Sequence, residues 1–348
     1  MGLKFGFAWP FRNPAFARVP WPDLYRSHLD LIVLSEVLGY DYAWLTEHHF
    51  LDDGYSPSLL PLAAAVATRT SRLRIGTFLV LLPLHNPVRI AEDTATVDLL
   101  SNGRFELGVG LGYRVKEFAD QGIPHTERGA RLQEGIALVQ RLLSGECVTY
   151  EGRFNHLHEI EIRPPALQRP HPPLWLGAIA PAAIERAARM GFHFQAVGPS
   201  AMDQVYDAAL ERHGRNPAEF NIAQLRAMFI APSRAQAWEL AAAPLHYMTR
   251  CYVEWFGEAD DKPGDQDALA ALPSVDEMIA RQSFSFFGEE VIVGTPEDAR
   301  GMLADYVTRG RMTHLVLMTA MPGLAPQHVR DCMQLFARTV LPAYRGRS

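Results

Sequence analysis

The sequence has few cysteines and no motif that would pair them. Its 348 residues contain three, Cys147, Cys251 and Cys332, which lie far apart and form no Cys-x-x-Cys pair. An odd number of scattered cysteines is typical of neither a disulfide framework nor a zinc knuckle. The sequence therefore predicts a protein of the reducing cytoplasm.

Long runs of one charge and long apolar runs are also absent. The formal net charge is -6 and the charges are dispersed along the chain, so no basic face is predicted for nucleic acid or anionic lipid. No apolar stretch approaches the roughly 20 residues that span a bilayer, and residues 3–9 do not resemble a secretion signal. We expect no nucleic-acid partner and no membrane segment.

Eight short β-rich runs alternate with longer helical stretches. Such alternation predicts βαβ units and a parallel sheet. Eight repeats favour one closed (β/α)8 TIM barrel over residues 1–348, although an open doubly wound sheet would give a similar pattern in any one stretch. The predicted strands are residues 3–9, 42–46, 73–82, 105–110, 174–177, 193–197, 222–230 and 314–319, and the predicted helices are 24–38, 59–70, 88–100, 128–143, 181–190 and 296–308.

Two stretches interrupt this alternation. Residues 146–173 are rich in proline, and residues 251–290 contain the polar run GEADDKPGDQD. Long excursions from a compact domain are commonly binding loops or lids. We expect both insertions over the C-terminal mouth of the barrel.

A carboxylate and two imidazoles, Glu47, His48 and His49, follow the second predicted strand directly. Side chains at the C-terminal end of a barrel strand enter the active-site mouth, and histidine exchanges protons near pH 7. Proton transfer is the function that this position favours, against the alternative that the histidines only cap a loop. A metal site is another alternative, since Glu47 and His49 project to one side of an extended strand. With no further ligand cluster in the sequence, we predict no metal.

Glycines alternate through residues 103–113, GRFELGVGLGY. This is not a dinucleotide-binding fingerprint, because Tyr113 stands where the third glycine is needed. Glycine at a strand end either lets the backbone approach a planar ligand or allows tight packing in the barrel interior, and both interpretations remain open. Further on, Pro181 begins a helix directly after a strand. Its free backbone amides could bind a phosphate, although an ordinary helix start looks the same.

The order of these motifs resembles the bacterial luciferase-like family. Glu47, His48 and His49 match its Glu-His-His strand end. The other matching segments are residues 70–77, 83–87, 91–93, 101–104, 150–152, 163–173 and 187–191. The resemblance covers most of the chain and weakens after residue 230.

The resemblance implies a flavin-dependent monooxygenase that uses reduced FMN and dioxygen, through a flavin hydroperoxide, to oxidise a hydrophobic small organic substrate. His48 becomes the catalytic acid or base, supported by Glu47 and His49. The residues that the resemblance places against the flavin are Thr77, Phe78, Gly110, Leu111 and Tyr113 at its ring, and Ala180, Ala182 and Ala183 at its phosphate.

The sequence also departs from the family pattern. Ala180, Ala182, Ala183 and Leu111 stand where many members have serine, threonine or arginine, so the phosphate would rest on backbone amides, helped by Arg114 or Tyr113. We therefore expect weak FMN binding, with reduced flavin supplied by a separate flavin reductase. The resemblance also implies a homodimer.

Other functions remain open at this stage. One is a deazaflavin-dependent oxidoreductase of the same superfamily, and another is a non-catalytic flavin-binding protein. A metal-dependent hydrolase is a third. Aromatic residues within 247–256 and 284–287 suggest an apolar lid over the substrate, or ordinary core filling.

Overall fold

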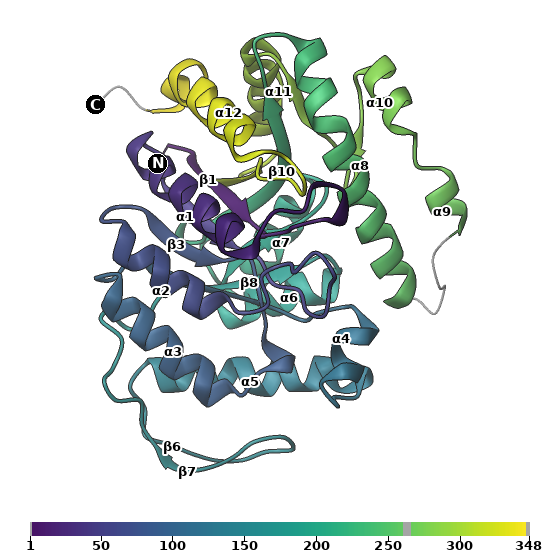
Figure 1. Ribbon diagram of the computed structural model, residues 1–348. Helices are drawn as coiled ribbons and strands as arrows, with labels where there is room; N and C mark the ends of the chain where they lie inside the picture. The colour runs from purple at the N-terminus through teal and green to yellow at the C-terminus, as the bar shows by residue number, and fades with distance from the viewer. Residues whose placement is uncertain (1, 260–265, 346–348) are drawn as a thin grey trace.

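The computed structural model describes residues 2–259 and 266–345. Eight parallel strands form a closed barrel, in which β9 and β10 pair to complete the ring. Helices surround the strands, and the long helix α8 stands beside the barrel (Figure 1). The barrel strands are β1 (Lys4–Trp9), β2 (Tyr42–Leu45), β3 (Arg74–Thr77), β5 (Phe105–Gly110), β8 (Leu174–Ala178), β9 (His193–Ala196), β10 (Ile222–Ile230) and β14 (His314–Met318).

The remaining elements lie around or beyond this ring. The helices are α1 (Trp21–Val37), α2 (Leu59–Arg69), α3 (Pro87–Leu100), α4 (Val115–Asp120), α5 (Arg128–Leu143), α6 (Pro181–Met190), α7 (Met202–Arg212), α8 (Arg234–Ala259), α9 (Gln266–Ala270), α10 (Val275–Arg281), α11 (Pro296–Arg309) and α12 (Pro326–Thr339). The other strands are β4 (Val80–Leu81), β6 (Val148–Glu151), β7 (His156–Ile160), β11 (Ser285–Phe286), β12 (Glu289–Glu290) and β13 (Ile292–Gly294). None of the described helices is long and apolar enough to cross a membrane.

The eight predicted strands and the closed barrel are confirmed. One boundary is different, because the predicted strand 73–82 divides into β3 and β4 around a cis peptide between Phe78 and Leu79. Helices α7, α8 and α12 and strand β13 were not predicted from the sequence. Helix α8 contains an internal proline, Pro244, and its last turns belong to the predicted insertion 251–290.

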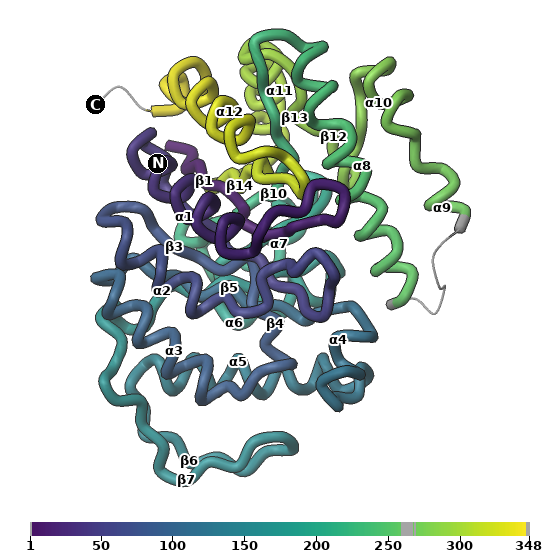
Figure 2. Tube along the Cα trace, in the orientation of Figure 1, coloured from purple at the N-terminus to yellow at the C-terminus, as the bar shows by residue number. Residues whose placement is uncertain are grey.

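The prediction that residues 146–173 cover the mouth is wrong. This segment forms the β6–β7 hairpin, which projects beyond α5 (Figure 2). Its return path is fixed by Asp98 at the end of α3, whose carboxylate accepts the backbone amides of Leu167 at 2.7 Å and Gln168 at 2.9 Å. Because α3 leads into the start of β5, these hydrogen bonds hold the return path at the N-terminal end of the barrel, while the hairpin tip packs along α5 through Glu127 and Glu134, and none of the segment lines the cavity at the mouth.

The second insertion does reach the mouth. Residues 251–259 are the last turns of α8, and Tyr252 and Phe256 project from them into the cavity described below. Phe287, in the turn between β11 and β12, reaches the same cavity. The polar run at residues 260–265 lies outside the described residues.

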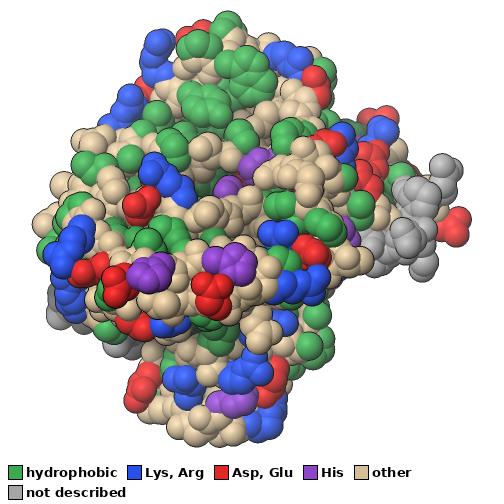
Figure 3. Space-filling model, turned by 90° about the horizontal axis from the view of Figure 1, so that it is seen from below, with side chains coloured by type: hydrophobic (Ala, Val, Ile, Leu, Met, Phe, Trp, Pro, Cys, Tyr) green, Lys and Arg blue, Asp and Glu red, His purple; other side chains and the backbone are tan. Residues whose placement is uncertain are grey.

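The outer surface carries both signs of charge. On the face shown in Figure 3, acidic and basic side chains are interspersed. That face therefore presents no extended patch of one sign to a polyanion.

A buried carboxylate joins four strands of the barrel through hydrogen bonds in the barrel interior. Glu106 on β5 is 3% exposed and accepts hydrogen bonds from the hydroxyl of Tyr42 at 3.0 Å, the Nε of Arg74 at 2.5 Å and the indole of Trp175 at 2.6 Å. These donors come from three other strands. One acidic side chain thereby satisfies polar groups that the apolar barrel would otherwise bury without partners.

Replacing Glu106 should therefore destabilise the fold. In Glu106→Leu the donors of Tyr42, Arg74 and Trp175 lose their acceptor, and the free energy of unfolding should fall by about 3 kcal/mol. Urea unfolding followed by circular dichroism measures the change. The exposed Glu211, whose side chain makes no described hydrogen bond or ion pair, is the control. Glu211→Leu should shift the free energy by less than about 0.5 kcal/mol, and equal losses in the two variants would contradict the assigned role.

Candidate active site

A cavity of about 290 Å³ opens at the C-terminal ends of the barrel strands. Most of its lining is apolar, and its polar side chains are few. The residues around it are Thr46, Glu47, His48, Tyr55, Phe78, Leu79, Leu81, Leu111, Gly112, Tyr113, Gly177, Ala178, Ile179, Ala180, Ala183, Gln195, Val197, Leu225, Tyr252, Phe256, Phe287 and Met318. An apolar cavity with a few converging polar groups is the usual form of a small-molecule site.

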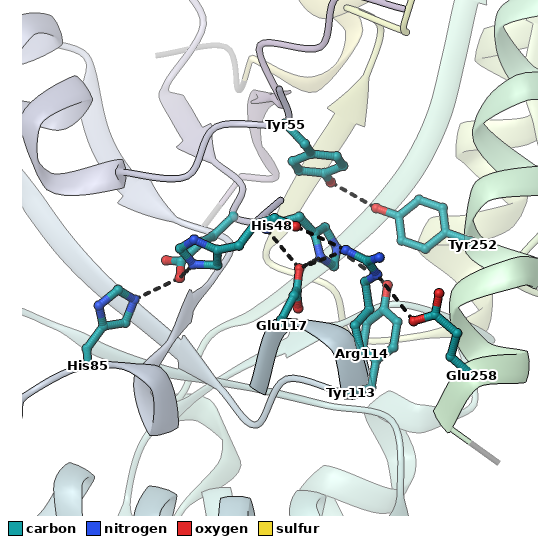
Figure 4. A network of polar contacts seen from close by, with 10 residues as sticks. His48, Tyr55, His85, Tyr113, Arg114, Glu117, Tyr252 and Glu258 are labelled. Carbon is teal, nitrogen blue, oxygen red and sulfur yellow. Dashed lines mark hydrogen bonds and ion pairs between the residues drawn. The ribbon is translucent and has the colours of Figure 1, made fainter. Parts of the chain in front are cut away.

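The polar side of the cavity is organised by Glu117 on α4. Its Oε1 lies 2.8 Å from Nδ1 of His48 and accepts the backbone amide of His49 at 2.9 Å. The guanidinium of Arg114 also reaches this oxygen, at 3.4 Å, and donates to the carbonyl of His49 at 3.1 Å. Figure 4 shows these side chains meeting around His48. The end of β2 and the segment after β5 are thus joined at one oxygen atom.

The environment keeps Glu117 ionised. Burial alone would raise the pKa of its carboxyl, but the hydrogen bonds from His48 and from the amide of His49, with the charge of Arg114, lower that pKa below its ordinary value. An ionised carboxylate only accepts hydrogen bonds, so Nδ1 of His48 carries the proton of that contact. In neutral His48 the other nitrogen, Nε2, is then an acceptor, and it lies 3.4 Å from the hydroxyl of Tyr113.

A second carboxylate, Glu47, binds two other histidines. Its Oε1 lies 2.8 Å from Nε2 of His49 and 2.8 Å from Nε2 of His85. Burial would raise the pKa of Glu47, but these two histidines lower it, and burial would lower the pKa of His85, but Glu47 raises it. The three side chains could also hold a metal ion, since their ligand atoms lie within 4.8 Å of one another. The 2.8 Å separations are ordinary hydrogen-bond lengths, which account for the cluster without an ion.

Aromatic side chains surround the exposed edge of His48. The rings of Tyr55 and Trp255 lie 4.6 Å and 4.8 Å from the imidazole, measured between centroids. The hydroxyls of Tyr55 and Tyr252 are hydrogen-bonded at 2.9 Å, which links the loop after β2 to helix α8. Of the aromatic residues for which the sequence left a lid or core filling open, Tyr252, Phe256 and Phe287 line the cavity, whereas Phe284 and Phe286 are buried in the core.

The structure brings together many of the predicted site residues but not all of them. Four of them do not line the cavity: His49, Thr77, Gly110 and Ala182. Those that line it are Glu47, His48, Phe78, Leu111, Tyr113, Ala180 and Ala183.

The four others have positions that explain their absence from the lining. Thr77 is buried, and its hydroxyl donates to the carbonyl of Gly108 at 2.7 Å and accepts its amide at 2.8 Å, so it joins β3 to β5. His49 turns toward Glu47. Ala182 is exposed on α6. Gly110 packs against Leu79, because a Cβ at Gly110 would lie 2.3 Å from that side chain.

This close packing favours the packing explanation for Gly110, while Gly112 of the same run lines the cavity. Leu79 also lies against Gly177 on the neighbouring strand, where a Cβ would meet it at 1.9 Å. The glycines make room for Leu79, whose side chain then forms part of the cavity wall.

The phosphate site inferred from the sequence has little side-chain support. Ala180 is the N-cap of α6 and makes no side-chain cap. Arg114, considered as a helper for the phosphate, is instead held by His49 and Glu117. Among the described residues, no lysine or arginine lines the cavity.

Glu117, His85 and Gln195 were not among the site residues predicted from the sequence. Glu117 and His85 lie in loops or short helices that follow strand ends, and nothing local marks them as partners of the histidines. Gln195 on β9 donates to the carbonyl of Thr77 at 2.8 Å, while its Oε1 is buried with no hydrogen-bond partner among the described residues. A polar residue within an apolar predicted strand was the one available signal for Gln195.

Comparisons with known proteins agree with this geometry. The family model described as luciferase-like monooxygenase matches residues 3–313. The oxygenase component of the flavin-dependent trigonelline monooxygenase of Acinetobacter baylyi is 24% identical over 333 residues, covering 92% of this chain and 90% of that protein. The F420-dependent glucose-6-phosphate dehydrogenase of Kineococcus radiotolerans is 29% identical over 333 residues, covering 91% and 92%.

A solved structure is similar as well. The monooxygenase RslO1 from Streptomyces bottropensis superposes with a TM-score of 0.81 at 27% identity, covering 98% of this chain and 100% of that one. The family match spans nearly the whole barrel, including its Glu-His-His strand end. The chain therefore belongs to the luciferase-like monooxygenase family.

Proposed function

We propose that the protein is an FMN-dependent monooxygenase that oxidises a hydrophobic small organic molecule with dioxygen. The observation that carries this proposal is the apolar cavity with the His48–Glu117 pair at its edge. Such a cavity suits a flat ring system beside an apolar substrate, and it limits the access of water to the reaction.

The residues of the cavity fit a flavin ring. Gln195 lines the cavity, and its Oε1 is a buried acceptor without a partner in the described structure. The ring N–H of FMN is a donor that would satisfy this oxygen. The apolar wall formed by Leu79, Leu111 and Ala178 would lie against the ring system. Reduced FMN supplies the electrons for the activation of dioxygen when it is bound.

In this proposal His48 handles the proton of the reaction. Glu117 holds Nδ1, so Nε2 is presented to the aromatic side of the cavity. An imidazole held by a carboxylate in this way is oriented to accept or return a proton. Glu47 and His49 support the strand end through their own hydrogen bond.

The relatives include both flavin and deazaflavin enzymes, so the choice of FMN rests on the charges of the site. A deazaflavin cofactor carries a long anionic tail, and the lining offers it neither lysine nor arginine in the described part of the chain. FMN has a single phosphate, for which the start of α6 provides the backbone amide of Ala182, because Pro181 has no N–H and the amides of Ala183 and Ile184 donate to the carbonyl of Ala180. We infer weak binding of FMN and supply of reduced flavin by a separate reductase; the trigonelline relative is itself the oxygenase component of a flavin-dependent monooxygenase. A cytoplasmic homodimer is part of the same proposal.

The oxygenation itself can be tested with isotopic dioxygen. Protein supplied with NADH, a flavin reductase, FMN and ¹⁸O₂ should insert one labelled oxygen into a member of a panel of aldehydes, ketones, terpenes and aromatic compounds, detected by mass spectrometry. His48→Ala should lower the rate by about 100-fold or more, the usual contribution of a general acid or base. His156→Ala, on the exposed hairpin, is the control. Turnover of the panel with reduced deazaflavin and without dioxygen would contradict the proposal.

Binding of FMN should depend on Gln195. In Gln195→Met the side chain keeps its length but loses both the free acceptor and the donor to the carbonyl of Thr77. Loss of the acceptor should lower the affinity for FMN by about 3- to 10-fold, the value of one buried hydrogen bond. Quenching of flavin fluorescence during titration measures the dissociation constant. Gln204→Met, at an exposed position on α7, should bind FMN like the original protein. Tighter binding of the deazaflavin than of FMN would refute the choice of cofactor.

Glu117 should set the tautomer of His48. In Glu117→Gln the side-chain amide can donate to Nδ1, which would move the imidazole proton to Nε2 and remove the acceptor from the cavity. Two-bond ¹H–¹⁵N NMR spectra of the histidines report the tautomer, and the labelled-oxygen assay should show a loss of about 100-fold. Glu258→Gln is the control, since Glu258 approaches Arg114 at 3.8 Å and makes no described contact with His48. An unchanged tautomer would rule out this role.

A further inference from the structure

The cavity has two chemically different sides. Strand ends and adjacent loops contribute aliphatic side chains such as Leu79, Leu111 and Met318. The other side is aromatic, formed by Tyr55, Tyr113, Tyr252, Phe256 and Phe287. Because these rings lie around His48, the molecule that reacts there is bounded by aromatic surfaces.

The aromatic side chains pack against one another and leave edges and faces toward the cavity. The rings of Tyr113 and Phe256 are stacked at 4.6 Å, and the ring of Phe287 lies 5.9 Å from Phe256 and 5.0 Å from Tyr252. A planar aromatic ligand can join such a cluster by stacking or edge contacts. A saturated ring of the same size gains only the burial of its apolar surface.

The polar atoms on the aromatic side of the cavity would pair best with a hydrogen-bond donor on the ligand. In the neutral imidazole Nε2 of His48 is an acceptor, since Nδ1 donates to Glu117, and its contact with the Tyr113 hydroxyl is long at 3.4 Å. The hydroxyls of Tyr55 and Tyr252 bind each other at 2.9 Å. Burial raises the pKa of both tyrosines, which keeps their hydroxyls protonated. A hydroxyl on the ligand could donate to Nε2 of His48 at a shorter distance than the 3.4 Å at which the Tyr113 hydroxyl lies.

The charges around the aromatic side favour an uncharged ligand. Arg12 lies 4.9 Å from the ring centre of Tyr55 and 5.3 Å from that of Trp255, and Arg114 lies 5.0 Å from the same tryptophan. The rings of Tyr55 and Trp255 therefore already make cation–π contacts with these guanidinium groups, which leaves less attraction for a cationic ligand. Arg12 is itself neutralised by Asp53 at 2.6 Å. In the described lining, neither lysine nor arginine offers a counter-ion to a carboxylate or phosphate on the ligand.

We propose that the substrate is an uncharged phenol, with its ring among Tyr113, Phe256 and Phe287 and its hydroxyl donating to Nε2 of His48. The inference names the substrate class of the proposed monooxygenase and rests on that function for the reaction that follows binding. The binding itself depends only on the described side chains.

Isothermal titration calorimetry on the full-length protein, with and without oxidised FMN, tests the inference using four probes of similar size. 2-Naphthol should bind about tenfold more tightly than decahydro-2-naphthol, since several ring contacts are lost in the saturated compound. It should also bind several-fold more tightly than 2-methoxynaphthalene, which cannot donate to His48, and than the cation N-methylquinolinium.

Variants assign the selectivity to the cavity. Phe256→Leu keeps an apolar side chain but removes a ring, so it should reduce the preference for 2-naphthol over the saturated probe by about threefold. Phe154→Leu, the same substitution on the β6–β7 hairpin, should leave the preference unchanged. His48→Phe should abolish the difference between 2-naphthol and 2-methoxynaphthalene while it retains the aromatic preference.

The outcomes separate this inference from the proposed function. Equal affinity for the naphthol and its saturated analogue, or tighter binding of N-methylquinolinium, would overturn the phenol assignment whatever the cofactor. Failure of FMN to bind, with the naphthol selectivity intact, would instead overturn the monooxygenase proposal and support the substrate class on its own.

Discussion

One carboxylate oxygen, Oε1 of Glu117, determines the geometry of the candidate site. It receives the imidazole of His48, the backbone amide of His49 and the guanidinium of Arg114. Two of these donors belong to the segment after β2, and the carboxylate belongs to the segment after β5. The contact therefore fixes the backbone of the Glu-His-His segment, the orientation of the imidazole and the position of its protons together. A buried carboxylate with three donors is also strongly favoured in its ionised form.

The strand that positions Glu117 has a second acidic residue at its other end. Glu106, in β5, gathers donors from three other strands near the bottom of the barrel, while Glu117 follows the same strand at the top. Between them the glycines of β5 and β8 admit the side chain of Leu79. Stability and site geometry are thus divided along one strand, in the way expected of a barrel whose chemistry lies at the C-terminal face.

The barrel could be predicted from the sequence because each strand is a short apolar run followed by a segment with helical periodicity. The sequence was also sufficient to place His48 at the mouth of the barrel, because His48 closely follows the end of a strand. Partners that depend on tertiary contacts could not be read in this way. Glu117 is separated from His48 by 69 residues, and its helix α4 is only six residues long. The first insertion was misplaced because composition identifies an excursion but not the end of the barrel to which Asp98 holds it.

The distribution of polar groups connects cofactor affinity with the aromatic lid. The start of α6 offers alanines where a side-chain grip on phosphate would be expected, whereas the aromatic side of the cavity is densely connected through Tyr252, Tyr55 and His48. In the proposed monooxygenase, binding energy would therefore be concentrated on the ring systems rather than on the phosphate. A cofactor held mainly by its ring could be exchanged with a reductase between turnovers, because no strong charge pair has to be broken on its release. Retention of the proposed substrate would then depend on the aromatic residues of α8 and of the β11–β12 turn that line the cavity beside His48.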